Sequence, residues 1–131
     1  MRVEFPYARE KSQLFGSILR PVAKVVLNDR FPNIMYVDSG ADITLLPKSV
    51  GELIGLKTEK GEGPGQIFGV GQSSVGVFIR QIAMTIGSSR FKARVAWCSS
   101  EDVPMLLGRL DIFRRFSILF KENNRTVTFY S

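Results

Sequence analysis

Histidine is absent from this chain of 131 residues, and cysteine occurs once, as Cys98. Without histidine the chain cannot form a Ser-His-Asp or Cys-His catalytic site, and it lacks the commonest metal ligand. A lone cysteine forms no disulfide within the chain and no metal site, and its place after Val95-Ala96-Trp97 is typical of a small buried apolar residue. We therefore expect no metal and no cofactor, and any hydrolytic chemistry must use carboxylate, lysine, serine, threonine or tyrosine side chains.

Long apolar segments are also missing. No stretch approaches the roughly 20 apolar residues that are needed to span a bilayer. The chain starts Met1-Arg2-Val3-Glu4, with no apolar segment behind a basic start, so no signal peptide is indicated. We expect no membrane segment and, by default, a cytoplasmic location. A piece of a longer precursor would have the same features.

The size and charge of the chain fit one globular domain over residues 1–131, since 44% of its residues are hydrophobic. The net charge of +6 raises the question of nucleic-acid binding. The densest basic cluster, Arg90, Lys92 and Arg94, alternates with apolar residues, which is typical of a strand with one solvated face. No aromatic residues interleave with the charges on that face, so we expect no nucleic-acid partner, and a nucleic-acid-binding β-barrel is the lowest-ranked function.

Short apolar or alternating segments separated by turn residues predict a mainly-β fold. Strands are expected over residues 18–27, 34–37, 43–46, 75–86, 91–97, 105–107, 117–121 and 126–130. The stretch 48–54 between Pro47 and Gly55 predicts a short helix, and 109–115 predicts a second one.

Six glycines lie between Gly61 and Gly76. They predict a long, flexible β-hairpin with its tip over residues 69–74. A phosphate-binding loop is the rival interpretation. We set it aside because the segment has no Gly-Lys-Ser/Thr ending and no helical pattern follows it.

The most informative segment follows the apolar strand 34–37, which leads directly into Asp38-Ser39-Gly40. Ser39 places a hydroxyl beside the carboxyl group of Asp38. Gly40 lets the backbone approach closely, so that amide N–H groups can point at the carboxylate. Asp-Ser-Gly is also an ordinary turn sequence, and these three residues alone favour that interpretation.

Three features in order resemble the retropepsin-like aspartic peptidases, the family that includes the retroviral proteases. The matching segments are Asp38-Ser39-Gly40-Ala41, the glycine-rich Ile67-Phe68-Gly69-Val70-Gly71, and Leu106-Leu107-Gly108-Arg109. Arg20-Pro21, at the start of the first long strand, also resembles the retroviral members, and the resemblance covers about residues 18–120. It implies a closed β-barrel with one or two short helices and a glycine-rich flap hairpin, assembled as a homodimer.

Two stretches extend beyond a minimal retroviral protease: an N-terminal extension over residues 1–17 and the end of a C-terminal hairpin over residues 122–131. Retroviral dimers commonly use their terminal strands as the interface. The resemblance therefore leaves the interface of this chain open.

The resemblance assigns roles to individual residues. Asp38, Ser39 and Gly40 would form the catalytic loop, with Ser39 hydrogen-bonded across the dimer and the Gly40 carbonyl facing the substrate. Asp42 and Arg109 match an ion pair that braces this loop, and Arg20 matches an arginine that reaches the partner's Asp42. Surface charges of little energetic value are the alternative for these three residues. The implied substrate-binding residues are Ala41, Asp42, Phe68, Gly69, Val70 and Gly71.

The chain carries one Asp-Ser/Thr-Gly motif, whereas this chemistry requires two carboxylates. Two carboxylates a few ångströms apart cannot both ionise cheaply, so one keeps a proton while the other activates water. The predicted function is cleavage of extended polypeptides by an obligate homodimer. Apolar side chains should flank the cut, because Ile67, Phe68, Val70 and Val77 surround the cleft in this prediction. The alternative is a non-catalytic module of the same fold that binds peptides or mediates dimerisation.

Overall fold

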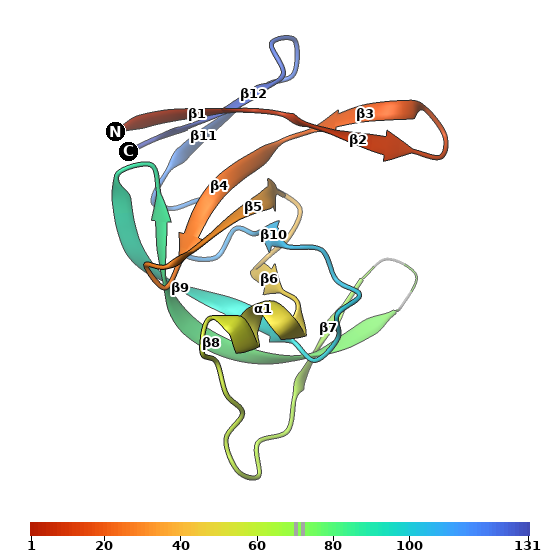
Figure 1. Ribbon diagram of the computed structural model, residues 1–131, viewed down its shortest axis with the longest axis vertical. Coiled ribbons are helices and arrows are strands. Elements are labelled where there is room, and N and C mark those ends of the chain that lie inside the picture. The colour runs from red at the N-terminus through yellow and green to blue at the C-terminus, as the bar shows by residue number, and fades with distance from the viewer. Residues whose placement is uncertain (70, 72) are drawn as a thin grey trace.

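The structure is a computed structural model that describes residues 1–69, 71 and 73–131. This part of the chain contains twelve strands and one α-helix, α1 (Lys48–Leu53) (Figure 1). The strands are β1 (Arg2–Pro6), β2 (Ala8–Ser12), β3 (Gly16–Arg20), β4 (Val22–Leu27), β5 (Phe31–Val37), β6 (Thr44–Leu46), β7 (Gly65–Phe68), β8 (Ser74–Ile86), β9 (Ser89–Cys98), β10 (Leu106–Leu107), β11 (Ser117–Lys121) and β12 (Thr126–Tyr130).

A closed barrel forms the centre of the fold. Among the described residues the largest sheet has the strand order β4-β5-β10-β6-β9-β8-β7, and β4 also pairs with β8. The first six strands in this order therefore close into a barrel, with β4 and β8 paired at the seam. Closure removes the exposed sheet edges that invite aggregation. β7 remains outside as the first strand of a hairpin with β8. The predicted mainly-β, closed-barrel fold is confirmed.

The interior of the barrel is filled by alternate residues of its strands. Val25 and Leu27 of β4, Met35 of β5 and Val95 of β9 are completely buried. Cys98 is also buried, which confirms that it is a small core residue, and burial raises the pKa of its thiol.

Strand β9 has the predicted alternation of exposed and buried residues. Arg90, Lys92 and Arg94 are exposed, and the residues between them are buried. Arg90 Nε lies 2.7 Å from a carboxylate oxygen of Asp29, and Arg94 Nε lies 2.8 Å from one of Asp111. Two of the three charges are thus paired within the chain, as expected for a solvated strand face.

The prediction of a second helix over residues 109–115 is wrong, because the segment forms consecutive turns. Asp111 adopts a left-handed backbone conformation with φ of 64°, which a right-handed helix does not allow. Its carboxylate accepts hydrogen bonds from the backbone N–H and the guanidinium of Arg94, at 2.8 to 2.9 Å. These bonds hold the pKa of Asp111 at about 2, below its ordinary value of 3.8.

The predicted strand over residues 18–27 is divided at Pro21 into β3 and β4. Proline has no N–H to donate, although its carbonyl still accepts a hydrogen bond from the Val37 N–H at 3.0 Å. β4 enters the barrel, whereas β3 turns away and pairs with β2 in a separate two-stranded hairpin.

The two ends of the chain are held together. β1 pairs with β12 from Arg2 opposite Tyr130 to Pro6 opposite Thr126, and β12 also pairs with β11, as predicted for the final hairpin. Phe129 of β12 is fully buried. Residues 1–17 therefore contribute β1 and β2 to the fold of the domain. In the described part of the chain, no helix has the length and apolar character needed to cross a membrane.

Candidate active site

Asp38 follows directly after β5, at the point where the chain leaves the barrel. β5 runs parallel to β10, with Val37 opposite Leu107, and both of these residues are buried. The Asp38 N–H donates to the Leu107 carbonyl at 3.1 Å. The end of β5 at Asp38 and the end of β10 at Gly108 are thus side by side, although they are far apart in the sequence.

The Asp38 loop has the geometry that Gly40 was expected to permit. The Gly40 N–H donates a 2.9 Å hydrogen bond to Asp38 Oδ1, and the Ala41 N–H donates to the Asp38 carbonyl at 3.3 Å. A Cβ atom at position 40 would lie 3.3 Å from Asp38 Oδ1, so a larger residue would crowd the carboxylate. Asp38 is half-buried, and Ser39 is exposed beside it.

Backbone hydrogen bonds from the chain after β10 support this loop. The Arg109 N–H donates to the Ala41 carbonyl, and the Leu110 N–H donates to the Asp42 carbonyl, both at 2.9 Å. Gly108 packs so tightly that a Cβ there would lie 2.4 Å from the carbonyl carbon of Ile43. The Asp38 loop and the segment Leu106-Leu107-Gly108-Arg109 are therefore packed directly against each other.

Thr44 is a supporting residue that the sequence analysis did not identify. It is fully buried, and its hydroxyl accepts a 3.0 Å hydrogen bond from the Gly108 N–H. An unpaired N–H at this depth would be costly, so Thr44 stabilises the close approach at Gly108. Its polar side chain between Ile43 and Leu45 is the signal that could have pointed to it.

The predicted ion pair between Asp42 and Arg109 is not formed within the described chain. The Arg109 guanidinium instead lies over the ring of Phe113, 5.6 Å from its centroid, and Nη1 is 3.4 Å from the Ser39 carbonyl. Arg109 therefore contacts the Asp38 loop through its backbone N–H and through the Ser39 carbonyl, and not through the Asp42 carboxylate.

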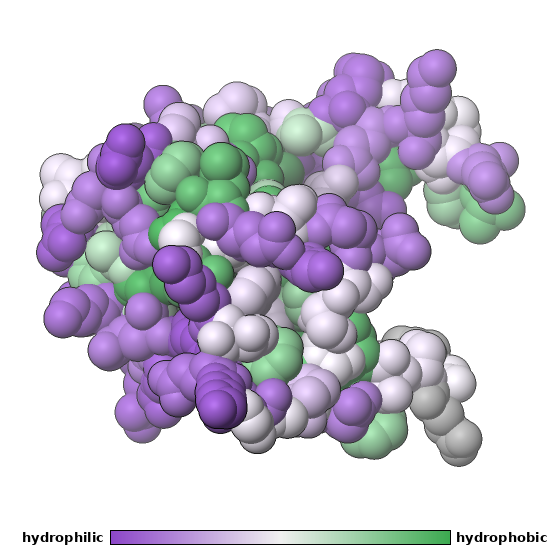
Figure 2. All heavy atoms as spheres, turned by 60° about the horizontal axis from the view of Figure 1, so that its bottom comes forward, coloured by the Kyte–Doolittle hydropathy of each residue, from purple (hydrophilic) through white to green (hydrophobic). Residues whose placement is uncertain are grey.

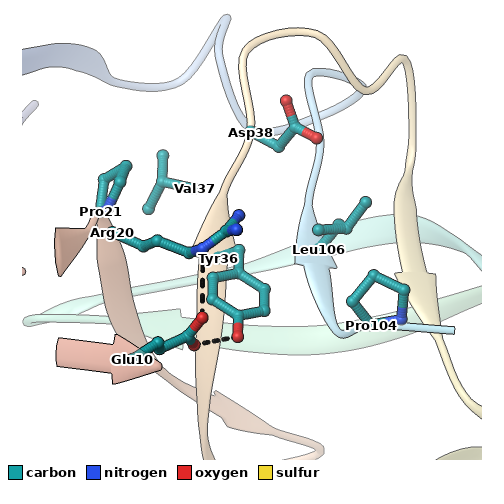
Figure 3. Close-up of a pocket in the computed structure, with 8 residues that line it drawn as sticks. All are labelled: Glu10, Arg20, Pro21, Tyr36, Val37, Asp38, Pro104 and Leu106. Carbon is teal, nitrogen blue, oxygen red and sulfur yellow. Dashed lines mark hydrogen bonds and ion pairs between the residues drawn. The ribbon is translucent and has the colours of Figure 1, made fainter. Parts of the chain in front are cut away.

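Arg20 has a partner within its own chain. Its Nε lies 3.1 Å from Glu10 Oε2, its guanidinium sits 5.8 Å from the centroid of the Tyr36 ring, and the Tyr36 hydroxyl donates to Glu10 (Figure 3). The hydrogen bond to Glu10 raises the pKa of Tyr36. The sequence analysis did not single out Glu10 or Tyr36, and the contact of Arg20 with the partner's Asp42 stays a prediction.

Glu10, Arg20 and Tyr36 line one side of a hollow of about 510 Å³ that reaches Asp38 (Figure 3). Pro104 and Leu106 line it from the other side. The hairpin β2–β3 is therefore attached to β5 two residues before Asp38.

A larger groove of about 970 Å³ extends from Asp38 to the flap hairpin β7–β8. Of the predicted substrate-binding residues, Ala41, Asp42, Phe68 and Gly69 line it, whereas Gly71 does not and Val70 lies outside the described residues. Its walls are mainly apolar, with contributions from Ile43, Leu45, Ile67, Val75, Val103 and Leu106. Such a groove suits a polypeptide with apolar side chains.

Val77 does not reach the groove, contrary to expectation. Only 4% of its surface is exposed, and it packs with Ala96 and Cys98 in a small second core below the flap. Period-2 alternation puts Val77 on the same face of β8 as Val75, so the difference lies in their depth. Val77 is opposite Cys98 of β9, where the hairpin merges with the barrel, and Ile67 and Val75 pack against its cluster while they line the groove themselves.

The flap hairpin has the predicted position. β7 pairs with β8 from Gly65 opposite Val77 to Phe68 opposite Ser74, and the Gly69 N–H donates to the Ser73 carbonyl at 2.8 Å. Residues 70 and 72 of the predicted tip lie outside the described part. In the remainder of the chain, no cluster of three histidine, cysteine, aspartate or glutamate residues could hold a metal ion.

Comparison with known proteins bears on this arrangement. The family model for aspartyl proteases matches residues 23–109, which include the Asp38 loop, the flap and Gly108-Arg109. The chain belongs to the aspartyl protease family. A search of the curated proteins found no match to the chain.

Two solved structures share the fold of this chain. The EIAV protease complexed with the inhibitor HBY-793 is 24% identical, with a TM-score of 0.56 over 76% of this chain and 88% of that one. A retropepsin-like aspartic protease from Rickettsia conorii is 16% identical, with a TM-score of 0.69 over 96% of this chain and 98% of that one. At these identities the likeness is one of fold.

Proposed function

We propose that the protein is an aspartic endopeptidase that cleaves extended polypeptides with two Asp38 residues, one from each subunit of a homodimer. The observation that carries this proposal is the position of Asp38. Its carboxylate accepts the Gly40 N–H at one end of a large apolar groove, and a flap hairpin borders the same groove. A family match over residues 23–109 supports the same conclusion.

The chemistry follows from the pairing of two like charges. Two adjacent carboxylates keep one proton between them, so one Asp38 is ionised while the partner's Asp38 is protonated. The ionised carboxylate takes a proton from a shared water, whose oxygen attacks the scissile carbonyl carbon. The protonated carboxyl group donates to the carbonyl oxygen, which becomes the hydroxyl of a tetrahedral diol. Transfer of a proton to the amide nitrogen then lets the C–N bond break.

Neighbouring residues position the dyad in this proposal. The Gly40 N–H fixes the rotation of the Asp38 carboxylate, and the Gly40 carbonyl faces the substrate. The exposed Ser39 hydroxyl bonds across the dimer. Arg109 holds the loop through its backbone, while Arg20 and Asp42 approach each other across the interface.

The substrate lies as a strand between the Asp38 loop and the flap. Among the residues that the structure describes, β7 is the last strand in its sheet, so one of its edges can hydrogen-bond an extended peptide. Phe68 is 72% exposed at the groove, and Ala41, Asp42, Gly69, Val70 and Gly71 complete the contacts in this proposal. The apolar walls predict apolar side chains beside the cut. Cleavage sites flanked mainly by charged residues would contradict this specificity.

The deciding test is a peptide-library digest read by mass spectrometry from about pH 3 to pH 8, a range that brackets a coupled carboxylate pair. We expect cleavage by the wild type and none by Asp38→Asn. Asp102→Asn is the matched control, because Asp102 lines the same groove and loses the same charge. Equal cleavage by wild type and Asp38→Asn would refute the proposal.

The rival function is a peptide-binding module without catalysis, and the same groove would serve it. Binding of a fluorescent apolar peptide distinguishes the two functions. A dimeric wild type that binds the peptide without cutting it, with binding unchanged in Asp38→Asn, would establish the module instead of the peptidase.

A further inference from the structure

The hairpin β2–β3, here called the arm (residues 8–20), stands apart from the rest of the fold. Its two strands pair from Ala8 opposite Arg20 to Ser12 opposite Gly16, and in the described part of the chain neither strand joins another sheet. A two-stranded hairpin alone gains little stability in water. At its tip Leu14 is 83% exposed and Phe15 is 76% exposed, more than any other large apolar residue that the structure describes.

The arm points to the same side of the molecule as the flap. In Figure 1 both hairpins extend to the right, with the ends of β5 and β10 between them, while the chain termini lie on the opposite side. Figure 2 shows the two projections separated by an open hollow, with apolar surface at the end of the upper one and the flap at the lower one. The arm therefore overhangs the face of the molecule that carries Asp38.

The base of the arm is fixed relative to Asp38. Glu10 of β2 bonds Arg20 of β3 at 3.1 Å and accepts the Tyr36 hydroxyl, and Tyr36 lies on β5 two residues before Asp38 (Figure 3). These contacts hold the base of the arm beside Asp38, and the two strands pair from there to the turn that carries Leu14 and Phe15.

The requirement for a second Asp38 indicates which molecule contacts the tip of the arm. If two Asp38 residues form the dyad, the two-fold axis passes beside Asp38 and the second copy faces this side of the molecule. An arm that overhangs this side then reaches the second copy, and symmetry makes the contact twice. The terminal strands β1 and β12 are already paired with each other within one chain. They also lie near the termini, on the side of the molecule opposite the arm (Figure 1). Of the two hairpins on the side of Asp38, the flap borders the groove, which leaves the arm to meet the second copy.

We propose that the arm is the dimerisation element of this protein, with Leu14 and Phe15 buried against the second copy. This inference rests on the proposed function, because the dyad is what places the partner. Apolar contacts suit the association, since two copies with a net charge of +6 each repel one another at low ionic strength. The dimer should consequently tighten as salt screens this repulsion.

The test compares two double variants by sedimentation over a concentration series from nanomolar to high micromolar. Leu14→Ser/Phe15→Ser removes the apolar tip. Leu53→Ser/Ile79→Ser is the matched control, because these side chains are 63% and 52% exposed on α1 and β8. We expect the tip variant to raise the dimer Kd at least about tenfold, since association no longer removes the apolar surface of Leu14 and Phe15 from water. The control should keep the wild-type Kd.

Thermal unfolding of the variants, followed by circular dichroism, checks that they are folded. Each variant changes only two exposed side chains, so both should unfold at the same temperature as the wild type. If the tip variant is folded and dimerises as tightly as the wild type, the arm is not the interface. In that case, cleavage that depends on Asp38 would still support the proposed peptidase. A wild type that is monomeric over the whole series and inactive would overturn the arm and the peptidase together.

A tandem fusion of two tip-variant chains through a long flexible linker separates dimerisation from substrate binding. Linking raises the effective concentration of the second copy without restoring the apolar tip. We expect the fusion to recover the cleavage that the unlinked tip variant loses at low concentration. If the KM stays raised in the fusion and the dimer Kd of the unlinked variant is normal, the tip binds polypeptide substrate instead, and the proposal fails.

Discussion

The arm and the flap leave the barrel on the same side, and their differences show how two hairpins can serve one site (Figure 1). Each has an ion pair near its base, Glu10 with Arg20 at 3.1 Å in the arm and Glu62 with Arg80 at 2.6 Å beside the flap. Six glycines fall within residues 61–76 around the flap, whereas the arm has Gly16 alone. Glycine makes backbone changes inexpensive, so the flap suits opening over a substrate. The arm suits a lasting contact.

Their exposed aromatic residues extend the comparison. Phe68 of the flap lines the groove next to Asp38, while Phe15 of the arm does not line it. Both are more than 70% exposed in the single chain. In the two proposals similar exposure therefore has two meanings, a surface for substrate in one hairpin and a surface for the second copy in the other.

The largest expected effect comes from a substitution at Gly108, where the chain after β10 packs against the backbone beside the Asp38 loop. Gly108→Ala would place a Cβ 2.4 Å from the backbone of Ile43, and backbone there cannot move without displacing the Asp38 loop. We expect the free energy of unfolding to fall by about 3 kcal/mol or more, as in other overpacked sites. Urea unfolding measures the change. Gly63→Ala is the control, since a Cβ at Gly63 meets nothing within 4 Å, and equal losses in both variants would contradict the assignment.

A second prediction separates the hairpins by function. Phe68→Ser should raise the KM for an apolar peptide about tenfold, because one large side chain no longer packs on the substrate, and it should leave the dimer Kd unchanged. Phe15→Ser should do the reverse. Steady-state kinetics at a concentration where each variant is dimeric, together with sedimentation, gives both quantities. If the two variants changed KM and Kd alike, the division of roles between the hairpins would be wrong.

The smallest expected effect concerns the pH dependence of the ion pair beside the flap. The hydrogen bond from Arg80 lowers the pKa of Glu62 to about 2 from its ordinary value of 4.5. A lowered folded pKa stabilises the fold above the unfolded pKa, and this stabilisation is lost as the pH falls from about 4.5 to about 2. Glu62→Gln should melt slightly below the wild type at pH 6, and the difference should vanish near pH 2. A difference that persists at pH 2 would mean that the glutamate charge is not its source.

Much of the fold was predictable because its signals are local. The alternation of charged and apolar residues in β9 follows from period 2 alone, and Gly40 beside Asp38 predicted a close backbone N–H. The helix over residues 109–115 was wrong for a non-local reason. Asp111 bonds the backbone and guanidinium of Arg94, 17 residues earlier, and these bonds stabilise a left-handed residue where a helix was expected.

The candidate site divides in the same way. Asp38, Ser39 and Gly40 are neighbours in the chain, so their common loop could be predicted from the sequence. Arg20 was expected to act across the interface, but in the chain its partner is Glu10. Nothing in the spacing of these residues indicates that contact, because it exists only where β2, β3 and β5 come together.

The sequence by itself determined the elements whose causes lie within a few residues: the strands of the barrel and of the final hairpin, the helix α1, the Asp38 loop and the glycine-rich hairpin. It did not indicate β1 and β2, which form only where they pair with β12 and β3. Only the tertiary structure decided what surrounds them. It paired β1 with β12, placed Thr44 under Gly108, and set the arm beside Asp38. The physical reason is that local conformation follows from the sterics and hydrogen bonds of neighbouring residues, whereas long-range contacts depend on how the whole barrel closes.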